Sequence, residues 1–378
     1  MPTVADVARR FGEACLAKFG AEMPSPQRDV LGLITRCRTG QLGTVVYHCE
    51  HCQTTHQIGR SCGNRHCPNC QQGKTQSWLE GQLANLLPCP YFLLTFTIPA
   101  SLRSFVRAHQ SVCYQALFRA SSETIRAFAA DPKYVGAPDC GMLGVLHTWG
   151  RTLSYHPHVH YVVPGGGLNA DGTQWLNSGP AFFIPVRAAS VVYRQKFQAE
   201  MERAGLLDQI PQSVWVEAWV VDSRAVGDGR RAMKYLAPYV YRVAISNRRI
   251  ETIEDTPDGR GWVTFTYRKS GSNRVRRMRV SGFEFLRRFL QHVLPAGFQK
   301  IRYYGFLSAR RRKHLEHVRW LVTLDQGEVY ELTSLPRQSV VSRLPTCPTC
   351  GSVLTLIGFL KPSCLPVPAA PPAVIDTS

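Results

Sequence analysis

The feature that most constrains the fold of this chain is a block of cysteines and histidines at Tyr47–Cys70, which reads YHCEHCQTTHQIGRSCGNRHCPNC. It contains two Cys-x-x-Cys turns, Cys49/Cys52 and Cys67/Cys70, with fourteen residues between them. Each such turn presents two thiolates, and four thiolates form the tetrahedral site that zinc prefers. Two turns at this spacing rarely occur by chance. The sequence therefore predicts a structural Zn²⁺ site formed by these four cysteines.

Other possible ligands lie close to this block: Cys37, His56, Cys62 and His66. They either complete a second zinc site, for which we include Cys62 and His66 among the candidate ligands, or belong to the core around the first site. A later CPTCG segment supplies Cys347 and Cys350, which is half a site, because only Cys364 follows it. A third zinc has little support from this pattern.

The thirteen cysteines suggest a reducing environment. The first twenty residues lack the apolar segment of an export signal. The longest apolar run, YFLLTFTIP, is too short to span a bilayer. We therefore expect a cytoplasmic protein with no membrane partner, in which the cysteines bind metal rather than form disulfides.

Positive charge is concentrated in one region of the chain. The net charge is +19, and residues 230–319 contain 22 Lys and Arg against 6 Asp and Glu. A charge of this size indicates a polyanionic partner. No basic amphipathic helix with a bulky apolar face stands out in this region, so nucleic acid is favoured over a membrane surface.

Hydrophobic periodicity divides the middle of the chain into strands and helices. We predict strands at 90–99, 142–150, 158–164 and 213–222, helices at 101–130, 186–205, 227–243 and 282–294, and a basic hairpin at 262–280. This order predicts an α+β fold, with an antiparallel sheet covered by helices on one face. We expect three regions: a helix and small zinc-binding domain at 1–88, the sheet core with the basic stretch at 89–320, and a C-terminal extension with a disordered tail at 321–378.

Three histidines alternate along the segment SYHPHVHYVVP: His156, His158 and His160. Alternate residues of a strand face the same way and lie about 6.6 Å apart, so two imidazoles can hold one ion, whereas three span about 13 Å. Pro157 cannot donate to a strand ladder and is expected to mark the start of the strand. This favours His158 and His160 as ligands and leaves His156 at the rim.

A pair of tyrosines lies in the segment KYLAPYVYRVAISNRRI. Tyr235 and Tyr239 are four residues apart, so on a helix they share one face. Two amphipathic core tyrosines would also explain this spacing. Basic residues surround the pair and are candidate DNA contacts: Lys234, Arg242, Arg248 and Arg249.

Taken together, the segments FLLTFTIP, LHTWGRTLSYHPHVHYVVPGGGL, KYLAPYVYRVAISNRRI and FLQHVLPAGFQKIRYYGFL resemble the two-tyrosine HUH transposases of bacterial rolling-circle insertion sequences. The cysteine block resembles the zinc-binding domain at the start of those proteins. The resemblance runs from about Cys37 to about Cys350, and the motifs come in the order of that family.

This resemblance implies a HUH-nuclease-like core in which His158 and His160 bind Mg²⁺ or Mn²⁺. Tyr235 would attack a phosphodiester of single-stranded DNA, leaving a 5′-phosphotyrosine and a free 3′-OH, and Tyr239 would act in the second transfer. The implied function is a DNA transposase that nicks and rejoins strands in rolling-circle-type transposition. The alternatives are a plasmid replication initiator or relaxase with the same chemistry, and a zinc DNA-binding protein without catalysis.

Two details of the site stay open at this point. Pro238 precedes Tyr239, and a proline inside a helix kinks it, which makes Tyr241 a rival second nucleophile. The third metal ligand is either Glu217, the lone carboxylate of VWVEAWV, or His147.

Overall fold

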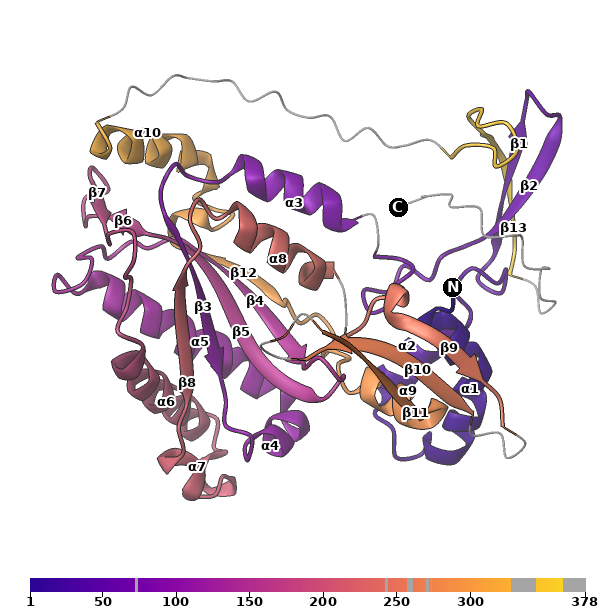
Figure 1. The fold of residues 1–378 in the computed structure, drawn as a ribbon, viewed down its shortest axis with the longest axis horizontal. Helices are drawn as coiled ribbons and strands as arrows, with labels where there is room; N and C mark the ends of the chain where they lie inside the picture. The colour runs from indigo at the N-terminus through magenta and orange to yellow at the C-terminus, as the bar shows by residue number, and fades with distance from the viewer. Residues whose placement is uncertain are drawn as a thin grey trace.

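The computed structural model describes residues 1–71, 74–241, 244–256, 261–269, 272, 274–327 and 345–362. Three larger β-sheets organise these residues, beside one small two-stranded sheet (Figure 1). A five-stranded sheet forms the main body, a three-stranded sheet packs with the N-terminal helices beside it, and a second three-stranded sheet projects away from both.

The five-stranded sheet is antiparallel throughout, with the order β12-β4-β5-β3-β8. Its strands are β3 (Tyr91–Thr97), β4 (Met142–Trp149), β5 (Tyr155–Pro164), β8 (Val220–Ala225) and β12 (Ile301–Tyr304). β5 is the middle strand, with β4 and β3 hydrogen-bonded on either side. Side chains at the centre of β5 are therefore held in place by neighbours on both strands.

Helices cover both faces of this sheet (Figure 1). α5 (Gln110–Ala130) and α6 (Val186–Arg203) pack on the face that carries Phe92, Leu94 and Phe96. The other face is covered by α3 (Lys74–Ala84), α8 (Arg230–Tyr241) and α10 (Leu315–Asp325). The predicted α+β class and antiparallel sheet are confirmed, and the one difference is that helices lie on two faces instead of one.

A second core forms between the N-terminal helices and the basic hairpin. It joins α1 (Val4–Phe19), α2 (Ser25–Thr35), β9 (Ile250–Glu254), β10 (Trp262–Arg268), β11 (Val275–Ser281) and α9 (Gly282–Leu290). Thr3 caps α1 through a reciprocal pair of hydrogen bonds with Asp6. Phe11 packs so closely on Gly282 that a Cβ there would lie 2.3 Å from the ring, which explains the glycine at the start of α9. The predicted hairpin at 262–280 is present as β10 and β11.

The turn between β4 and β5 reaches into this second core. Leu153 has a left-handed φ of 62° and is fully buried among the second-core residues. Its carbonyl accepts hydrogen bonds from the Gln291 side chain at 2.6 Å and from His292 at 3.2 Å. Arg151, in the same turn, donates to the carbonyl of Lys269 beside β10 at 2.6 Å. The main sheet and the hairpin are therefore joined at this turn.

The projecting sheet has the order β13-β1-β2 and is also antiparallel. Its strands are β1 (Thr44–Cys49), β2 (Thr54–Gly59) and β13 (Thr355–Leu360). Strands from the two ends of the chain thus pair directly with each other (Figure 1).

The strand predicted at 213–222 is wrong over its first half. Residues Ser213–Val216 form the short helix α7, and β8 begins only at Val220. Trp215 and Trp219, four residues apart, stack with their ring centroids 5.8 Å apart, and Trp219 packs on Phe197 of α6. Alternating apolar residues suggested a strand, but Trp215 lies on the short helix and stacks on Trp219 just before β8, so that both rings are buried.

The remaining α-helix and strands are short: α4 (Arg103–Ala108), β6 (Gly166–Leu168) and β7 (Trp175–Asn177).

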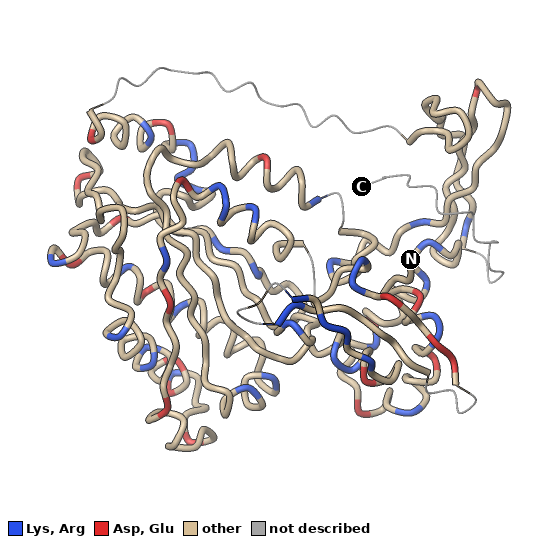
Figure 2. The backbone as a smooth tube through the Cα atoms, viewed as in Figure 1, with Lys and Arg blue, Asp and Glu red and all other residues tan. Residues whose placement is uncertain are grey.

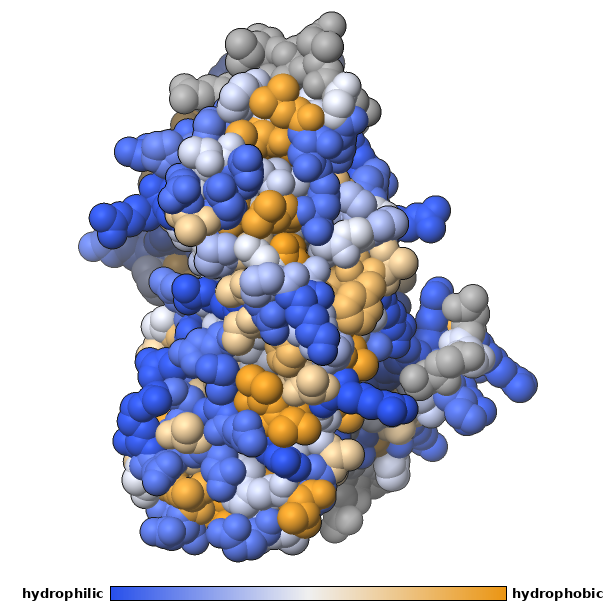
Figure 3. All heavy atoms as spheres, turned by 90° about the vertical axis from the view of Figure 1, so that its left-hand side faces the viewer, coloured by the Kyte–Doolittle hydropathy of each residue, from blue (hydrophilic) through white to orange (hydrophobic). Residues whose placement is uncertain are grey.

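Among the described residues, no helix combines the length and the apolar character needed to cross a membrane. Figure 3 shows that the end of the molecule with α6 and α10 carries mostly hydrophilic side chains, with hydrophobic residues in separated patches.

Candidate active site and metal centres

Three histidines meet on the α8 face of the main sheet. His158 and His160 lie on β5, and His147 lies directly opposite His158 on β4. One ring nitrogen of each residue lies within 4.8 Å of the others, and all three side chains are buried. Two neighbouring strands therefore supply three imidazoles to one point, which a single strand does not permit.

Of the two predicted third ligands, only His147 lies with His158 and His160 in the described part of the chain. Glu217 follows α7 and precedes β8, and no metal-ligating group in the described part of the chain includes it. His156 also lies outside the trio and lines the cleft above it, in agreement with its predicted place at the rim.

Hydrogen bonds on the far side of two rings orient the trio. Nδ1 of His158 lies 2.6 Å from the carbonyl oxygen of His156, and Nδ1 of His160 lies 2.8 Å from Oγ1 of Thr95. Donation from Nδ1 in both cases leaves the Nε2 lone pairs directed at the shared space. Nε2 of His147 is buried without a hydrogen-bond partner in the structure. An orphaned nitrogen beside two oriented imidazoles fits a metal ion at this point.

Burial also sets the protonation of the three rings. It lowers the pKa of His147 and of His158 well below the usual value, and lowers the pKa of His160 to about 4. The three imidazoles are consequently neutral at physiological pH, which is the form that coordinates metals. Three nitrogen donors without a carboxylate suit Mn²⁺ better than Mg²⁺, which prefers oxygen ligands.

Both predicted tyrosines lie on the face of α8 that covers the histidines. The Tyr235 ring centroid is 5.9 Å from that of His160, the Tyr239 centroid is 4.3 Å from that of His147, and the two tyrosines are 5.3 Å apart. Pro238 lies inside α8, yet the helix continues to Tyr241 and the shared face is kept. Tyr241 instead packs against the core on the other side of the helix and does not line the cleft.

The surroundings of the two tyrosines differ. The Tyr235 side chain is 46% exposed, and partial burial together with the neighbouring Tyr239 raises its pKa to about 12. The Tyr239 backbone carbonyl accepts a hydrogen bond of 3.2 Å from the partly buried side-chain amine of Lys300, which anchors the end of α8 over the trio. Sequence reasoning missed Thr95 and Lys300, since each becomes part of the site only through strand pairing.

A cleft of about 1200 Å³ opens above the trio and separates it from the basic hairpin. Its floor carries His147, His158, Tyr235 and Tyr239, and its opposite wall carries Arg249, Thr266, Tyr267 and Arg268. Three arginines, Arg276, Arg277 and Arg279, also follow one another along β11 (Figure 2). The cleft therefore places a basic wall opposite the histidines and tyrosines.

The predicted DNA contacts fall in different places. Arg249 lines the cleft and donates a 2.7 Å hydrogen bond to the carbonyl of Thr266. Lys234 is exposed on α8 next to Tyr235, and Arg248 is exposed beside Arg249. Arg242 lies outside the described residues.

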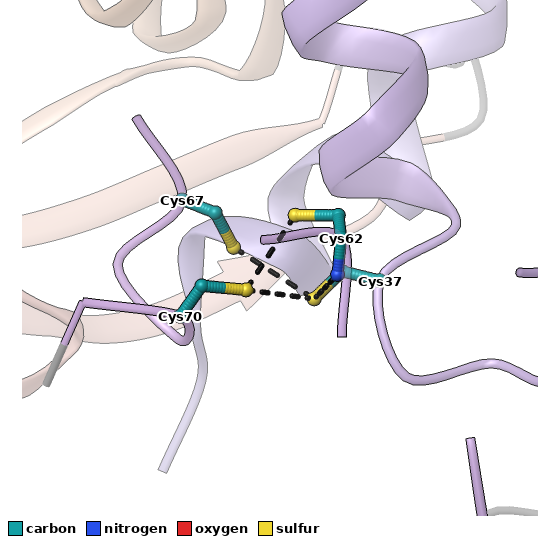
Figure 4. Close-up of side chains that lie close together, drawn as sticks. All are labelled: Cys37, Cys62, Cys67 and Cys70. Carbon is teal, nitrogen blue, oxygen red and sulfur yellow. Dashed lines mark hydrogen bonds between the residues drawn. The ribbon is translucent and has the colours of Figure 1, made fainter. Parts of the chain in front are cut away.

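The cysteines form a different pair of sites from the one predicted. Cys67 and Cys70 join Cys37 and Cys62 (Figure 4). The sulfur–sulfur separations include 3.6 Å for Cys37–Cys70, 3.5 Å for Cys62–Cys70 and 3.8 Å for Cys67–Cys37. Four sulfurs at about 2.3 Å from a tetrahedral zinc are about 3.8 Å apart, so this cluster has the dimensions of a Zn–Cys₄ site.

Cys49 and Cys52 lie instead with Cys347 and Cys350. The predicted site combining Cys49 and Cys52 with Cys67 and Cys70 is therefore wrong, because the two turns belong to separate clusters. Hydrogen bonding by Ser352 lowers the pKa of the Cys350 thiol to about 6, which favours the thiolate.

His66 is not a member of either cluster. Its Nε2 accepts a hydrogen bond of 3.1 Å from the backbone amide of Leu294, and its Nδ1 lies 3.1 Å from Asn64. Burial lowers its pKa to about 3, in keeping with a neutral acceptor. The His66 side chain thus links the first cysteine cluster to the segment that follows α9.

Known transposase families match both the N-terminal part and the central part of the chain. A family model described as "Transposase zinc-binding domain" matches residues 7–98, and one described as "Putative transposase" matches residues 141–314. The protein named "Putative transposase y4qJ" of Sinorhizobium fredii is 38% identical over 384 residues, covering 94% of this chain and 95% of its own. The chain belongs to the IS91 family of transposases.

A second relative of this IS91-family transposase is the transposase for insertion sequence element IS801 of Pseudomonas savastanoi pv. phaseolicola. It is 27% identical over 300 residues, covering 72% of this chain and 68% of its own. No solved structure matches the transposase. The match at 141–314 contains the three histidines and both tyrosines, whereas the zinc-binding match at 7–98 ends far before Cys347.

Proposed function

We propose that this IS91-family transposase nicks and rejoins single-stranded DNA through a 5′-phosphotyrosine intermediate, in rolling-circle-type transposition of an insertion sequence. The observation that carries the proposal is the placement of Tyr235 and Tyr239, on one helix face, against the histidine trio, two of whose members, His147 and His158, line a basic cleft. A nucleophile next to a candidate metal centre, opposite a wall that attracts phosphates, is the arrangement that strand cleavage needs.

In the first step the strand lies in the cleft with one phosphate above the trio. The Tyr235 oxygen attacks the phosphorus, the phenolic proton passes to water, and the bond from phosphorus to the 3′-oxygen breaks. That oxygen takes up a proton and leaves as a free 3′-OH, while the 5′-phosphate stays bonded to Tyr235. A phenol with a pKa of about 12 is largely unionised at neutral pH, so loss of its proton has to accompany the attack.

The second step reverses the first on another strand end. A 3′-OH attacks the phosphotyrosine, a new phosphodiester forms, and the tyrosine oxygen leaves. The energy of the broken bond is kept in the covalent intermediate, so joining requires no nucleotide hydrolysis. Tyr239, one helical turn from Tyr235, holds the second strand in the same way.

His147, His158 and His160 would hold the metal ion, Mn²⁺ or Mg²⁺. When bound, this ion supplies a Lewis acid that polarises the scissile phosphate. The protein residues hold the phosphate in line with Tyr235, and the wall formed by β10 and β11 keeps the strand in the cleft.

The proposal is tested by incubating the full-length protein with a labelled single-stranded oligonucleotide taken from the end of its element, in the presence of Mn²⁺. We expect a protein–DNA adduct that survives denaturation, with phosphotyrosine in the labelled peptide after protease digestion. The matching blunt duplex should give little adduct, because its stacked bases keep the phosphate away from the trio. Cleavage of the strand without an adduct would contradict the proposal.

Binding of the strand should depend on salt and on the charges around the cleft. Replacing the exposed Lys234 and Arg268 by glutamine should weaken binding about equally for oligonucleotides of any sequence. For single strands, the slope of log affinity against log salt should become shallower by about 0.7 for each lost phosphate contact. Fluorescence anisotropy at several salt concentrations measures both effects. Lys133→Gln, beyond the end of α5, serves as a matched control, and an equal loss in that variant would rule out the cleft as the DNA path.

A further inference from the structure

The second cysteine cluster is built from opposite ends of the chain. Sγ of Cys49 lies 3.6 Å from Sγ of Cys350, although the two residues are 301 positions apart in the sequence. All four ligand atoms of Cys49, Cys52, Cys347 and Cys350 lie within 4.8 Å of one another. A separation of 3.6 Å is too long for a disulfide, which requires about 2.05 Å, and close to the spacing of thiolates around one zinc ion.

The two turns that carry these cysteines have the same geometry. The amide of Gln53 donates to the carbonyl of Cys49 at 2.8 Å, and the amide of Gly351 donates to the carbonyl of Cys347 at 2.8 Å. Both donors have left-handed φ values, 55° for Gln53 and 76° for Gly351. A non-glycine residue rarely adopts this conformation without a reason. Two matched turns from two hairpins, facing each other with four thiols, are the ligand arrangement of a zinc ribbon.

The projecting sheet has almost no core to replace a metal ion. Its buried cluster consists of Cys49, Cys347 and Leu354, with Tyr47 and Cys52 partly buried beside it. The apolar side chains of β13 point largely to solvent, with Phe359 66% exposed and Ile357 56% exposed. A unit this small usually depends on a metal or on disulfides for its stability.

We propose that Cys49, Cys52, Cys347 and Cys350 bind one Zn²⁺ ion that fastens the C-terminal strand β13 onto the N-terminal hairpin β1–β2. This site is separate from the cluster of Cys37, Cys62, Cys67 and Cys70, and two of its four ligands lie far beyond the zinc-binding match at residues 7–98. Binding deprotonates the thiols, and its free energy is the folding free energy of the projecting sheet. The site is complete only in a chain that contains both ends.

Zinc content and local protection of the full-length protein test this proposal together. The wild-type protein should contain two zinc ions per chain by mass spectrometry of the metals, and Cys347→Ser combined with Cys350→Ser should contain one. Hydrogen exchange of β1 and β2 should become at least about tenfold faster in this variant, while β3 and β5 stay protected. Cys140→Ser, a buried cysteine outside both clusters, is the matched control and should keep two zinc ions.

A measurement on the wild-type protein avoids relying on a variant that folds poorly. Cys350 is exposed, so a free thiol there would react at once with iodoacetamide. We expect slow alkylation of Cys347 and Cys350 in the zinc-loaded protein and fast alkylation after a chelator removes zinc. One zinc in both the wild type and the double variant, disulfides among the four cysteines, or unchanged exchange of β1 after zinc loss would each overturn the proposal.

Discussion

Tyr235→Phe is expected to eliminate the covalent protein–DNA adduct while leaving the fold and DNA binding intact. The substitution keeps the ring that packs 5.9 Å from His160 and 5.3 Å from Tyr239, and removes only the attacking oxygen. Because Tyr235 is 46% exposed, loss of its hydroxyl leaves no buried group without a partner. We expect adduct formation to fall by at least about 1000-fold, since Tyr239, the other tyrosine on this face of α8, is assigned to the second transfer in the proposed order. Denaturing gels with a labelled oligonucleotide measure the adduct.

Tyr239→Phe is the matched variant on the same helix. It should still form the adduct on one strand but fail to complete transfer to a second strand. Tyr241→Phe should behave like the wild type, because Tyr241 packs on the other side of α8. An adduct at wild-type level with Tyr235→Phe would assign the first attack to Tyr239. If only the double variant loses the adduct, the two tyrosines are interchangeable and the proposed order is wrong.

Removing the imidazoles of the trio should produce the second large effect. His158→Ala with His160→Ala should reduce nicking by at least about 1000-fold at saturating Mn²⁺, because two of the three candidate ligands are lost. His147→Ala should also lower nicking strongly, and part of the loss should be recovered at higher Mn²⁺ concentration. Thr95→Val removes the hydroxyl 2.8 Å from His160 and should cost about 10- to 100-fold, the usual effect of losing a partner of a metal ligand.

His156→Ala is the control for this series. The residue lines the same cleft, and alanine keeps the backbone carbonyl that lies 2.6 Å from Nδ1 of His158. Its nicking rate should stay within about threefold of the wild type, and Glu217→Gln should have no effect. Nicking rates over a range of Mn²⁺ concentrations separate weaker metal affinity from lost chemistry. Full activity of the His158/His160 double variant, or a large loss in Glu217→Gln, would refute the trio as the metal centre.

Local patterns in the sequence were enough to predict the parts of the site carried by one element. The two-residue repeat identified His158 and His160 on a strand, and the four-residue spacing placed Tyr235 and Tyr239 on one helix face. α8 extends through Pro238 to Tyr241, although the proline ring cannot donate a hydrogen bond to the carbonyl of Lys234 one turn before it.

Partners brought together by tertiary structure were not predictable in the same way. His147 was a candidate, but only the register of β4 against β5 brings it opposite His158. Each predicted cysteine turn does lie in a cluster of four thiols that could hold a metal ion, but the predicted pairing of the turns was wrong because spacing along the chain favours the nearest turn. Cys350 meets Cys49 only because β13 pairs with β1 after more than 300 residues.

The turn at Leu153 has a consequence for the position of the proposed nick. This turn belongs to the strands that carry the trio, yet its buried side chain and its carbonyl are held by the second core that supports β10 and β11. The hairpin wall and the histidines are therefore held at a fixed position relative to each other. A strand gripped by the wall presents a phosphate to Tyr235 at a constant number of nucleotides from the gripped bases. Inserting one nucleotide between those bases and the nick should shift the cleaved bond along the sequence by one position, without slowing cleavage.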